Sequence, residues 1–381
     1  MCDIDIDLPT GARTHTIEVA RAFAAMGLDV HLIARGPDPQ LRGVHYLRAA
    51  GDEAEPGRRV VNITRLTISV LWRERHRARR LYLRHKWTTA PATIVGRLLG
   101  YRVVTEVDDV PYGRGYRGSI SPQRDYFYRA ITILVGRLSH GVVAGTEEAR
   151  SLLTEQFHIP RRRVGVVPIG VDVDYFQPQD REAALRRSDL DPTCRYVLFM
   201  GNFAEWVDFD TLLGAFAAVL REAPSARLLL VGDGEQRSHV EATIHSLGIE
   251  PAVTLTGFVR DRAAVRDLLG AATVLVASHR GEHLDRIGMN ATKIAEYLAS
   301  GRAVVVKDVA RLREMIQDTG AGRVVPEDPE AMASAILSLL EPERADAVGA
   351  IGRELAVNRY SWESTIRQTL PLFTLTACSR G

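Results

Sequence analysis

One helical segment in the second half of the chain carries residues that could bind a phosphate group. Asn290 suits the N-cap of this helix, and Gly301 suits the left-handed residue that follows it. Thr292 and Lys293 fall in the first turn, where free backbone N–H groups and the helix dipole favour an anion. Glu296 follows one turn later, and its carboxylate could accept hydrogen bonds from a ribose diol. The alternative interpretation is a surface helix with a Lys–Glu ion pair at i, i+3.

Lys293 is also unusual for its residue type, because the only other lysines of the chain are Lys86 and Lys307. Arginine supplies nearly all of the positive charge, so a lysine within a motif is a less casual choice here than elsewhere. This scarcity favours the phosphate hypothesis over the surface ion pair.

The elements that must position these residues follow a βα rhythm. Short β-branched runs alternate with amphipathic segments of helical length, which is typical of parallel sheets covered by helices. In the first half, strands are predicted at residues 2–8, 29–33, 93–95, 102–107, 141–143 and 164–168, and helices at residues 14–26, 124–138 and 147–157. The opening strand looks short, which leaves open that the start codon lies further upstream.

A second series follows a polar, proline-bearing stretch at residues 176–193, which predicts a linker and a domain boundary near residue 185. Strands are predicted at residues 195–200, 226–231, 253–256, 273–277, 303–306 and 322–325, and helices at residues 210–222, 237–247, 263–269, 291–300, 310–318 and 329–340. The predicted fold class is α/β, with two doubly wound Rossmann-like domains at residues 1–185 and 186–360. Their strand ends are expected to face each other across a cleft.

The composition excludes several classes of function. The 381 residues are about right for two domains, and a net charge of +2 is too small for a protein that binds nucleic acid through its phosphates. The three cysteines are scattered without metal-binding spacing, so no metal site is expected and a reducing cytoplasm fits. No apolar run is long enough for a transmembrane segment, and the acidic N-terminus is unlike a signal peptide.

Several motifs, in order and in register over nearly the whole chain, resemble one family. They are Pro9-Thr-Gly-Ala-Arg-Thr-His15, Val164-Gly-Val-Val-Pro-Ile-Gly-Val-Asp172, Tyr196-Val-Leu-Phe-Met-Gly201, Leu228-Leu-Leu-Val-Gly-Asp-Gly-Glu235, Val253-Thr-Leu-Thr-Gly257, Lys293-Ile-Ala-Glu-Tyr-Leu-Ala-Ser-Gly301 and Tyr360-Ser-Trp-Glu363. Together they resemble the retaining glycosyltransferases of family 4, which have the GT-B fold. The resemblance implies that residues 361–381 form a C-terminal helix that crosses back to the N-terminal domain.

The resemblance carries over unevenly to the donor site. Glu296 matches the second glutamate of the family's E-x7-E pair, which binds the nucleotide ribose, but Gly288 stands where the first would be. The family's diphosphate-binding arginine and lysine would fall at Asn202 and Val207, which carry no charge. The phosphate charge must then be met by other groups.

Side chains and backbone N–H groups around the expected cleft are the candidates for that role. The donor-binding residues expected here are Gly11, Ala12, Gly201, Asn202, Val259, Arg260, Arg286, Asn290, Thr292, Lys293 and Glu296. Among them, Lys293 and Arg286 would supply side-chain charge, the backbone of Val259 would read the edge of the base, and Arg260 could lie over its ring. A solvated loop charge is the alternative for Arg286.

The remaining candidates lie in the first domain. Asp108 and Asp109, at a strand end, are the polar catalytic candidates beside Lys293, since Val107 stands about where many relatives keep a histidine. His15 and Thr146 are acceptor-side candidates, although Thr146 also suits a helix N-cap and His15 an exposed helix terminus.

The resemblance implies transfer of a hexose-type sugar from a UDP-, GDP- or dTDP-linked donor, with retention and without a required metal or cofactor. The acceptor, small or lipid-linked, stays open, as do a homodimer, a peripheral membrane contact through the arginine-rich runs, and a place in specialised-metabolite or cell-wall biosynthesis. Two alternatives stay open as well: a sugar-nucleotide epimerase of the same fold, and a catalytically silent homologue acting as a binding subunit.

Overall fold

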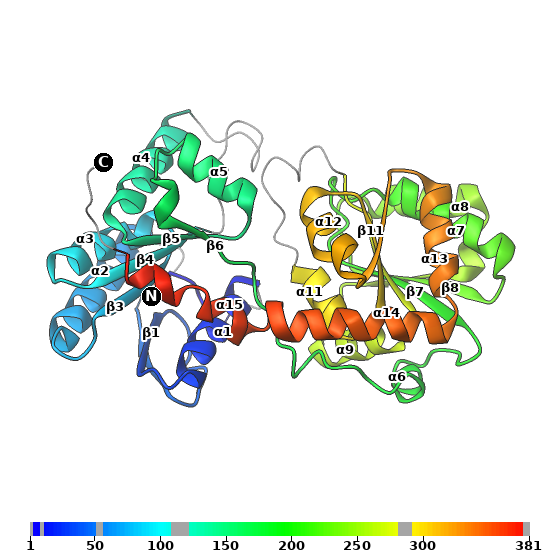
Figure 1. Cartoon of the computed structure of the whole chain (residues 1–381), viewed down its shortest axis with the longest axis horizontal. Helices are drawn as coiled ribbons and strands as arrows, with labels where there is room; N and C mark the ends of the chain where they lie inside the picture. The colour runs from blue at the N-terminus through cyan, green and yellow to red at the C-terminus, as the bar shows by residue number, and fades with distance from the viewer. Residues whose placement is uncertain (1–2, 8–10, 51–55, 108–121, 281–291, 376–381) are drawn as a thin grey trace. The chain divides into compact units, whose positions relative to one another are not determined.

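The computed structural model describes residues 3–7, 11–50, 56–107, 122–280 and 292–375 (Figure 1). The chain forms two compact units, one of residues 1–170 with 362–381, the other of residues 171–361. Residues 171–185, which the sequence analysis assigned to the first domain, thus belong to the second unit. In the described part, no helix is both long and apolar enough to cross a membrane.

The second unit is built on a six-stranded parallel sheet in the order β12-β11-β10-β7-β8-β9. Its strands are β7 (Arg195–Met200), β8 (Ala226–Val231), β9 (Val253–Gly257), β10 (Val274–Ala277), β11 (Ala303–Lys307) and β12 (Gly322–Val325). The central strands are apolar runs that are buried on both sides, as a sheet covered on both faces requires. The doubly wound topology predicted from the alternating pattern is confirmed.

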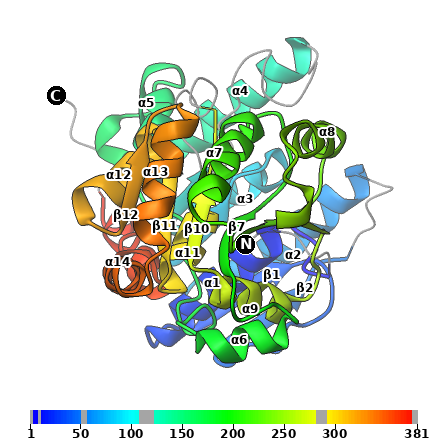
Figure 2. The same cartoon turned by 90° about the vertical axis from the view of Figure 1, so that its right-hand side faces the viewer.

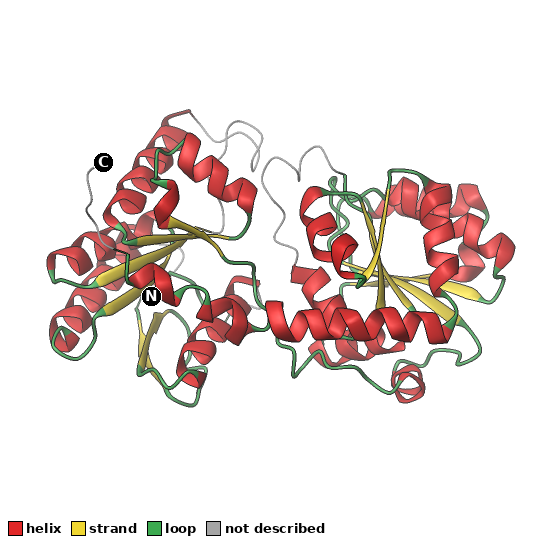
Figure 3. Ribbon diagram, in the orientation of Figure 1, coloured by secondary structure: helices red, strands yellow, loops and turns green. Residues whose placement is uncertain are grey.

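Helices cover both faces of this sheet (Figures 2 and 3). They are α6 (Arg181–Arg187), α7 (Phe209–Glu222), α8 (Arg237–Leu247), α9 (Arg262–Ala271), α11 (Thr292–Ala299), α12 (Ala310–Ile316), α13 (Pro329–Leu339) and α14 (Pro342–Leu355). One apolar core joins the sheet to α9, α11 and α12, and a second core joins its other face to α7, α8 and α13. The helix α6 lies where the sequence predicted a linker, because Ala184 and Leu185 are buried in the first of these cores.

The first unit contains two parallel sheets. The strands β1 (Val30–Ala34) and β2 (Val44–Arg48) pair with each other, and β3 (Arg80–Arg84), β4 (Arg102–Val107), β5 (Gly141–Ala144) and β6 (Val164–Val166) form a four-stranded sheet. Its helices are α1 (Gly11–Ala25), α2 (Pro56–Glu74), α3 (Ala90–Leu98), α4 (Pro122–Leu138), α5 (Glu147–Glu155) and α15 (Trp362–Arg367).

Short 3-10 or π turns occur in both units, at Trp87–Thr89, Arg161–Arg163, Glu250–Ala252, Gln317–Thr319, Ala356–Tyr360 and Leu370–Phe373.

One predicted strand of the first unit is wrong, and another forms only a single bridge in its described part. Residues 93–95 lie in α3, because Pro91 suits the first turn of that helix and Ala92 and Thr93 are buried on its inner face, so packing outweighs the strand preference of three β-branched residues. Among described residues of the predicted strand 2–8, a single bridge joins Asp5 to Arg35, and no longer ladder forms.

The last helix packs within the first unit. Trp362 and Ile366 of α15 share an apolar cluster with Val19, Ala22 and Phe23 of α1. The first and last segments of the second unit are joined by a hydrogen bond. The N–H of Val171 donates to the carbonyl of Tyr360 at 2.7 Å.

Candidate functional site

Glycine turns follow three neighbouring strands at the carboxyl edge of the second unit's sheet. Gly201, Gly232 and Gly257, which follow β7 and β8 and end β9, all have positive φ angles. A Cβ atom on Gly232 would collide with the carbonyl group of Gly201, and one on Gly201 would collide with the ammonium of Lys293. Gly232 therefore has no room for a side chain, whereas at Gly201 the flexible lysine side chain could move away. The N–H of Gly201 already donates to the carbonyl of Val231 at 2.9 Å, so Gly201 contributes space at this edge.

The helix α11 is held by its apolar face and one polar anchor. Ile294, Ala295, Tyr297 and Leu298 are buried in the core. The Tyr297 hydroxyl accepts a hydrogen bond from the N–H of Met200 at 2.8 Å, which ties α11 to the end of β7. The opposite side of the first two turns carries the functional candidates.

Lys293 carries a partly buried ammonium group whose charge few neighbouring groups balance. Its Nζ atom lies 5.0 Å from the centre of the Phe199 ring, a favourable cation–π arrangement. Burial lowers the pKa of Lys293 to about 8, and the charge of Glu296 only partly opposes that shift. No hydrogen bond or ion pair joins its ammonium to another residue that the structure describes.

Glu296 is also a partly buried charged group, with a negative charge in place of a positive one. Burial raises the pKa of Glu296 to about 7, although the charges of Arg262 and Lys293 lower it. Within the described ranges, its carboxylate accepts no hydrogen bond, and the surface ion pair with Lys293 considered as the alternative is not formed. Near neutral pH this helix thus holds a charged ammonium and a partly ionised carboxyl, neither of which has a hydrogen-bonding partner in the described part of the chain.

Ser278 and His279, directly after β10, add two buried polar groups that the sequence analysis missed. Their side chains are almost fully buried, and Ser278 Oγ and His279 Nδ1 have no partner among the described residues. Burial lowers the pKa of His279 well below its usual value, and the charges of Lys293 and Lys307 add to this, so the imidazole is neutral. A polar pair directly after an apolar strand was the available signal.

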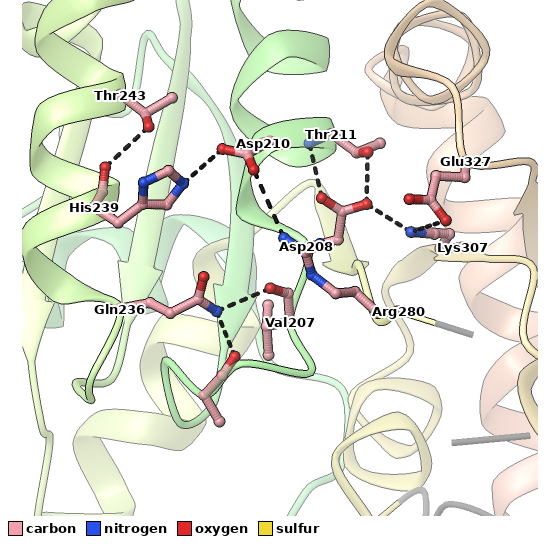
Figure 4. A network of polar contacts seen from close by, with 11 residues as sticks. Val207, Asp208, Asp210, Thr211, Gln236, His239, Thr243, Arg280, Lys307 and Glu327 are labelled. Atoms are coloured by element: carbon pink, nitrogen blue, oxygen red, sulfur yellow. Dashed lines mark hydrogen bonds and ion pairs between the residues drawn. The ribbon is translucent and has the colours of Figure 1, made fainter. Parts of the chain in front are cut away.

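A satisfied polar network lies beside these residues (Figure 4). Lys307 donates to Asp208 at 2.6 Å and pairs with Glu327 at 2.7 Å. Asp208 also caps α7 by accepting the N–H of Thr211 at 3.2 Å. Burial raises the pKa of Asp208, but the hydrogen bonds from Lys307 and Thr211 outweigh it and hold the pKa below the usual value. Lys307 is therefore a structural lysine, in contrast to Lys293.

The two positions where the family's cations would fall supply none. Val207 is fully buried, and its carbonyl accepts from Gln236 at 3.0 Å. Asn202 is exposed, and its side chain lies against Gly234.

The segment after β9 has mixed exposure. Val259 packs on the core, whereas Arg260 is exposed. Nearby on α9, the Arg262 guanidinium lies 4.1 Å from the centre of the Tyr175 ring and 3.5 Å from Asp172. Its position near Glu296 explains why its charge lowers the pKa of that group.

In the first unit the candidate His15 is hydrogen-bonded to a protein carboxylate. His15 Nε2 lies 2.8 and 2.9 Å from the two carboxylate oxygens of Glu106, and its ring contacts the Trp362 ring edge-on at 5.1 Å. Burial raises the pKa of Glu106, but the charge and hydrogen bond of His15 outweigh it and hold the pKa below the usual value. His15 is buried, contrary to the exposed alternative.

The other first-unit candidates are placed as follows. Gly11 and Ala12 begin α1, and the Ala12 carbonyl accepts from Arg84 at 3.1 Å. Thr146 is the N-cap of α5, because its hydroxyl accepts the N–H of Ala149 at 3.1 Å. Four predicted site residues lie outside the described residues: Asp108, Asp109, Arg286 and Asn290.

Two family models match this chain and together cover most of it. Residues 9–175 match the model described as Glycosyltransferase Family 4, and residues 194–342 match Glycosyl transferases group 1. A D-inositol 3-phosphate glycosyltransferase of Segniliparus rotundus is 34% identical over 233 residues, 60% of this chain and 50% of the relative. A GDP-mannose-dependent alpha-(1-6)-phosphatidylinositol dimannoside mannosyltransferase of Mycobacterium tuberculosis is 34% identical over 47% of this chain and 44% of that protein. The chain thus matches about half the length of these curated relatives.

Solved structures with the same fold cover almost the whole chain. A glycosyltransferase from Rickettsia africae has a TM-score of 0.71 at 19% identity, covering 98% of this chain and 97% of its own. Anabaena HepE in complex with UDP and glucose has a TM-score of 0.68 at 16% identity, covering 98% and 99%. These likenesses establish the GT-B fold.

Proposed function

Because the chain belongs to glycosyltransferase family 4, we propose that it transfers a hexose from a nucleotide diphosphate sugar to an acceptor hydroxyl with retention of configuration. The names of two compared proteins, one GDP-mannose-dependent and one bound to UDP and glucose, support a nucleotide donor. The scattered cysteines favour the cytoplasm as the compartment.

The partly buried charge of Lys293, which has no hydrogen-bonding or acidic partner among the residues that the structure describes, is the observation that carries this proposal. A departing diphosphate gains negative charge as its bond to the sugar breaks, and a helix N-terminus alone offers only about half a unit of positive charge. Lys293 adds a full charge at the first turn of α11, and the neighbouring Lys307 is already paired with carboxylates. We therefore assign the main side-chain contact to the diphosphate to Lys293.

Glu296 fits the ribose. A carboxylate held away from water, with no protein donor in the described part, is stabilised when two hydroxyl groups donate to it. The backbone of Val259, with Arg260 beside it, serves the base, and Thr292, Asn202 and the glycine turn at Gly201 line the remaining donor site.

The acceptor is received by the first unit. His15 is oriented by Glu106 and is the side chain we assign to acceptor positioning, together with Thr146, while Asp108 and Asp109 are kept as the catalytic candidates beside Lys293. The names of two relatives contain an inositol unit, so polyhydroxylated acceptors such as inositol phosphates are the first to try.

A panel of UDP-, GDP- and dTDP-sugars tests the proposal, first without an acceptor and then with inositol phosphates. Slow release of a sugar with the donor's anomeric configuration, accelerated by an acceptor, supports a retaining transferase. Interconversion of the intact donor would indicate an epimerase instead. Failure to bind or turn over any of the nucleotides would indicate a silent homologue and overturn the proposal.

A further inference from the structure

A cluster of two histidines and one aspartate lies in the first unit, outside the proposed donor site. His31 on β1 and His45 on β2 are direct partners in the register of this parallel pair, and Asp29 immediately precedes β1. The Asp29 carboxylate lies 3.2 Å from Nε2 of His45 and 3.9 Å from Nε2 of His31. One potential ligand atom from each of the three side chains lies within 4.8 Å of the others.

We propose that Asp29, His31 and His45 form a binding site for a divalent transition metal of the zinc class. Partners in register on adjacent strands project from the same face, and their backbones are only about 4.8 Å apart. The two imidazole rings accordingly lie side by side, with their centres 5.0 Å apart. Imidazole nitrogen and carboxylate oxygen are ligands that zinc prefers.

The geometry requires only small side-chain movements to bind a metal. Ligand atoms around a tetrahedral zinc ion lie roughly 3.3 Å apart, given a metal–nitrogen distance of about 2.0 Å. The 3.2 Å between Asp29 and His45 already matches this spacing, whereas the 3.9 Å to His31 must shorten; Asp29 and His45 are free to adjust, with 74% and 67% of their side chains accessible. Three protein ligands leave the fourth position for water.

A second observation concerns the ring of His31. Its Nδ1 atom is buried and has no partner among the described residues, whereas Nε2 faces the aspartate. Metal binding through Nε2 requires the proton to stay on the buried Nδ1, a cost that the metal–nitrogen bond has to exceed. Within those ranges, no other cluster of at least three histidine, cysteine or acidic side chains has ligand atoms this close together.

A metal bound at this site would stabilise the small sheet of β1 and β2. The strands β1 and β2 form a two-stranded sheet separate from the four-stranded sheet of the same unit, and β2 is only partly buried. A two-stranded sheet is marginally stable by itself. A metal that takes one ligand from each strand and one from the residue before β1 holds β2 in place.

Metal titration of the full-length, tag-free protein after treatment with a chelator tests this inference. Zn²⁺ is titrated by calorimetry and Co²⁺ by its visible absorption, for the wild type and for His31→Asn and His45→Asn. We expect one equivalent with micromolar or tighter affinity in the wild type, and a loss of affinity on the order of 100-fold in each variant. Zn²⁺ should also raise the unfolding temperature of the wild type but not of His45→Asn.

His239→Asn is the matched control, because His239 pairs with a single carboxylate, that of Asp210, at 2.7 Å. It should bind metal like the wild type. Circular dichroism checks that the variants fold, and the exposed His45 is the safer position. The inference is overturned if the wild type binds no metal in this range, or if folded His45→Asn binds it with unchanged affinity.

Discussion

Two glutamates, one in each unit, are removed from water in different ways. Glu106 faces the imidazole of His15, and its pKa stays below the usual value although burial alone would raise it. Glu296 has no hydrogen-bonding partner among the described residues, and burial raises its pKa to about 7. Glu106 is paired within the protein, whereas Glu296 lacks a donor in the described ranges, which agrees with the ribose contact that we propose for it.

The lysines of the second unit repeat this difference. Lys307 is buried between Asp208 and Glu327, whereas Lys293 lies beside an aromatic ring without an acid partner in the described part. Residue type alone does not separate the two lysines, but their hydrogen bonds do. An unpaired, partly buried charge at the carboxyl edge of a parallel sheet is typical of a ligand-binding group, which agrees with the role that we propose for Lys293.

The largest effect is expected for Lys293→Met. Turnover should fall by about 10²–10³, because the contact strengthens as the diphosphate departs, with a smaller loss of ground-state donor affinity. Steady-state kinetics on the best donor of the panel measure both. Lys86→Met, in the other unit, is the control for donor affinity. Near-normal turnover of Lys293→Met, with collapse in Arg286→Ala, would transfer the role to the arginine.

A smaller effect is expected for Glu296→Gln. Loss of a charge-assisted hydrogen bond of about 1.5–3 kcal/mol should weaken nucleoside diphosphate binding roughly 10- to 150-fold. Equilibrium titration measures the affinity, and Glu241→Gln, an exposed glutamate paired with Arg237, serves as the control. Unchanged affinity in Glu296→Gln would remove this residue from the site.

The two glutamates should affect stability with opposite signs at pH 8. Glu106→Gln should lower the free energy of unfolding by about 1–3 kcal/mol, because it removes the charge that His15 pairs with. Glu296→Gln should raise it, by on the order of 1–3 kcal/mol, because the cost of burying an unpaired carboxylate disappears. Chemical denaturation of both variants measures this, and a destabilised Glu296→Gln would show that its carboxylate is already paired.

The pH dependence of the stability gained in Glu296→Gln follows from the direction of the pKa shift of Glu296. The folded-state pKa of Glu296 lies above the unfolded value, so its stability cost is fully present above pH 7 and disappears as the pH falls toward the unfolded pKa. The gain in Glu296→Gln should therefore shrink in acid. Glu106 behaves in the opposite way, because its folded-state pKa is lowered: its contribution is present above the unfolded pKa and is lost as the pH falls through the folded one.

The smallest effect is expected in the pH profile of donor affinity. Affinity should be greatest between pH 7 and 8, since Glu296 loses its charge below about 7 and Lys293 loses its charge above about 8. On the acid and alkaline sides of this maximum, donor affinity should change by no more than about tenfold per pH unit. Glu296→Gln should flatten the acid limb and Lys293→Met the alkaline one. A profile that both variants leave unchanged would assign the titrating groups elsewhere.

The sequence predicted the second unit better than the first. The strands of the second unit are apolar runs, which are typical of a buried parallel sheet. Residues 93–95 have the composition of a strand but form part of a helix, because packing decides their structure. The motif around Lys293 could be read from the chain, but the pairing of Lys307 with Asp208 and Glu327 joins residues far apart in the sequence and could not. The burial of Ser278 and His279 depends likewise on distant residues, so local composition could not reveal it.

Proton uptake on nucleoside diphosphate binding is the most direct test of Lys293 as the diphosphate ligand. Calorimetry at pH 8 in buffers of different ionisation enthalpy measures it for the wild type and Lys293→Met. Because Lys293 has a pKa of about 8 in the free protein and a bound diphosphate raises it, the wild type should take up about half a proton. Lys293→Met should bind more weakly and take up none. Equal affinity and equal proton uptake in the two proteins would contradict the assignment of the diphosphate to Lys293.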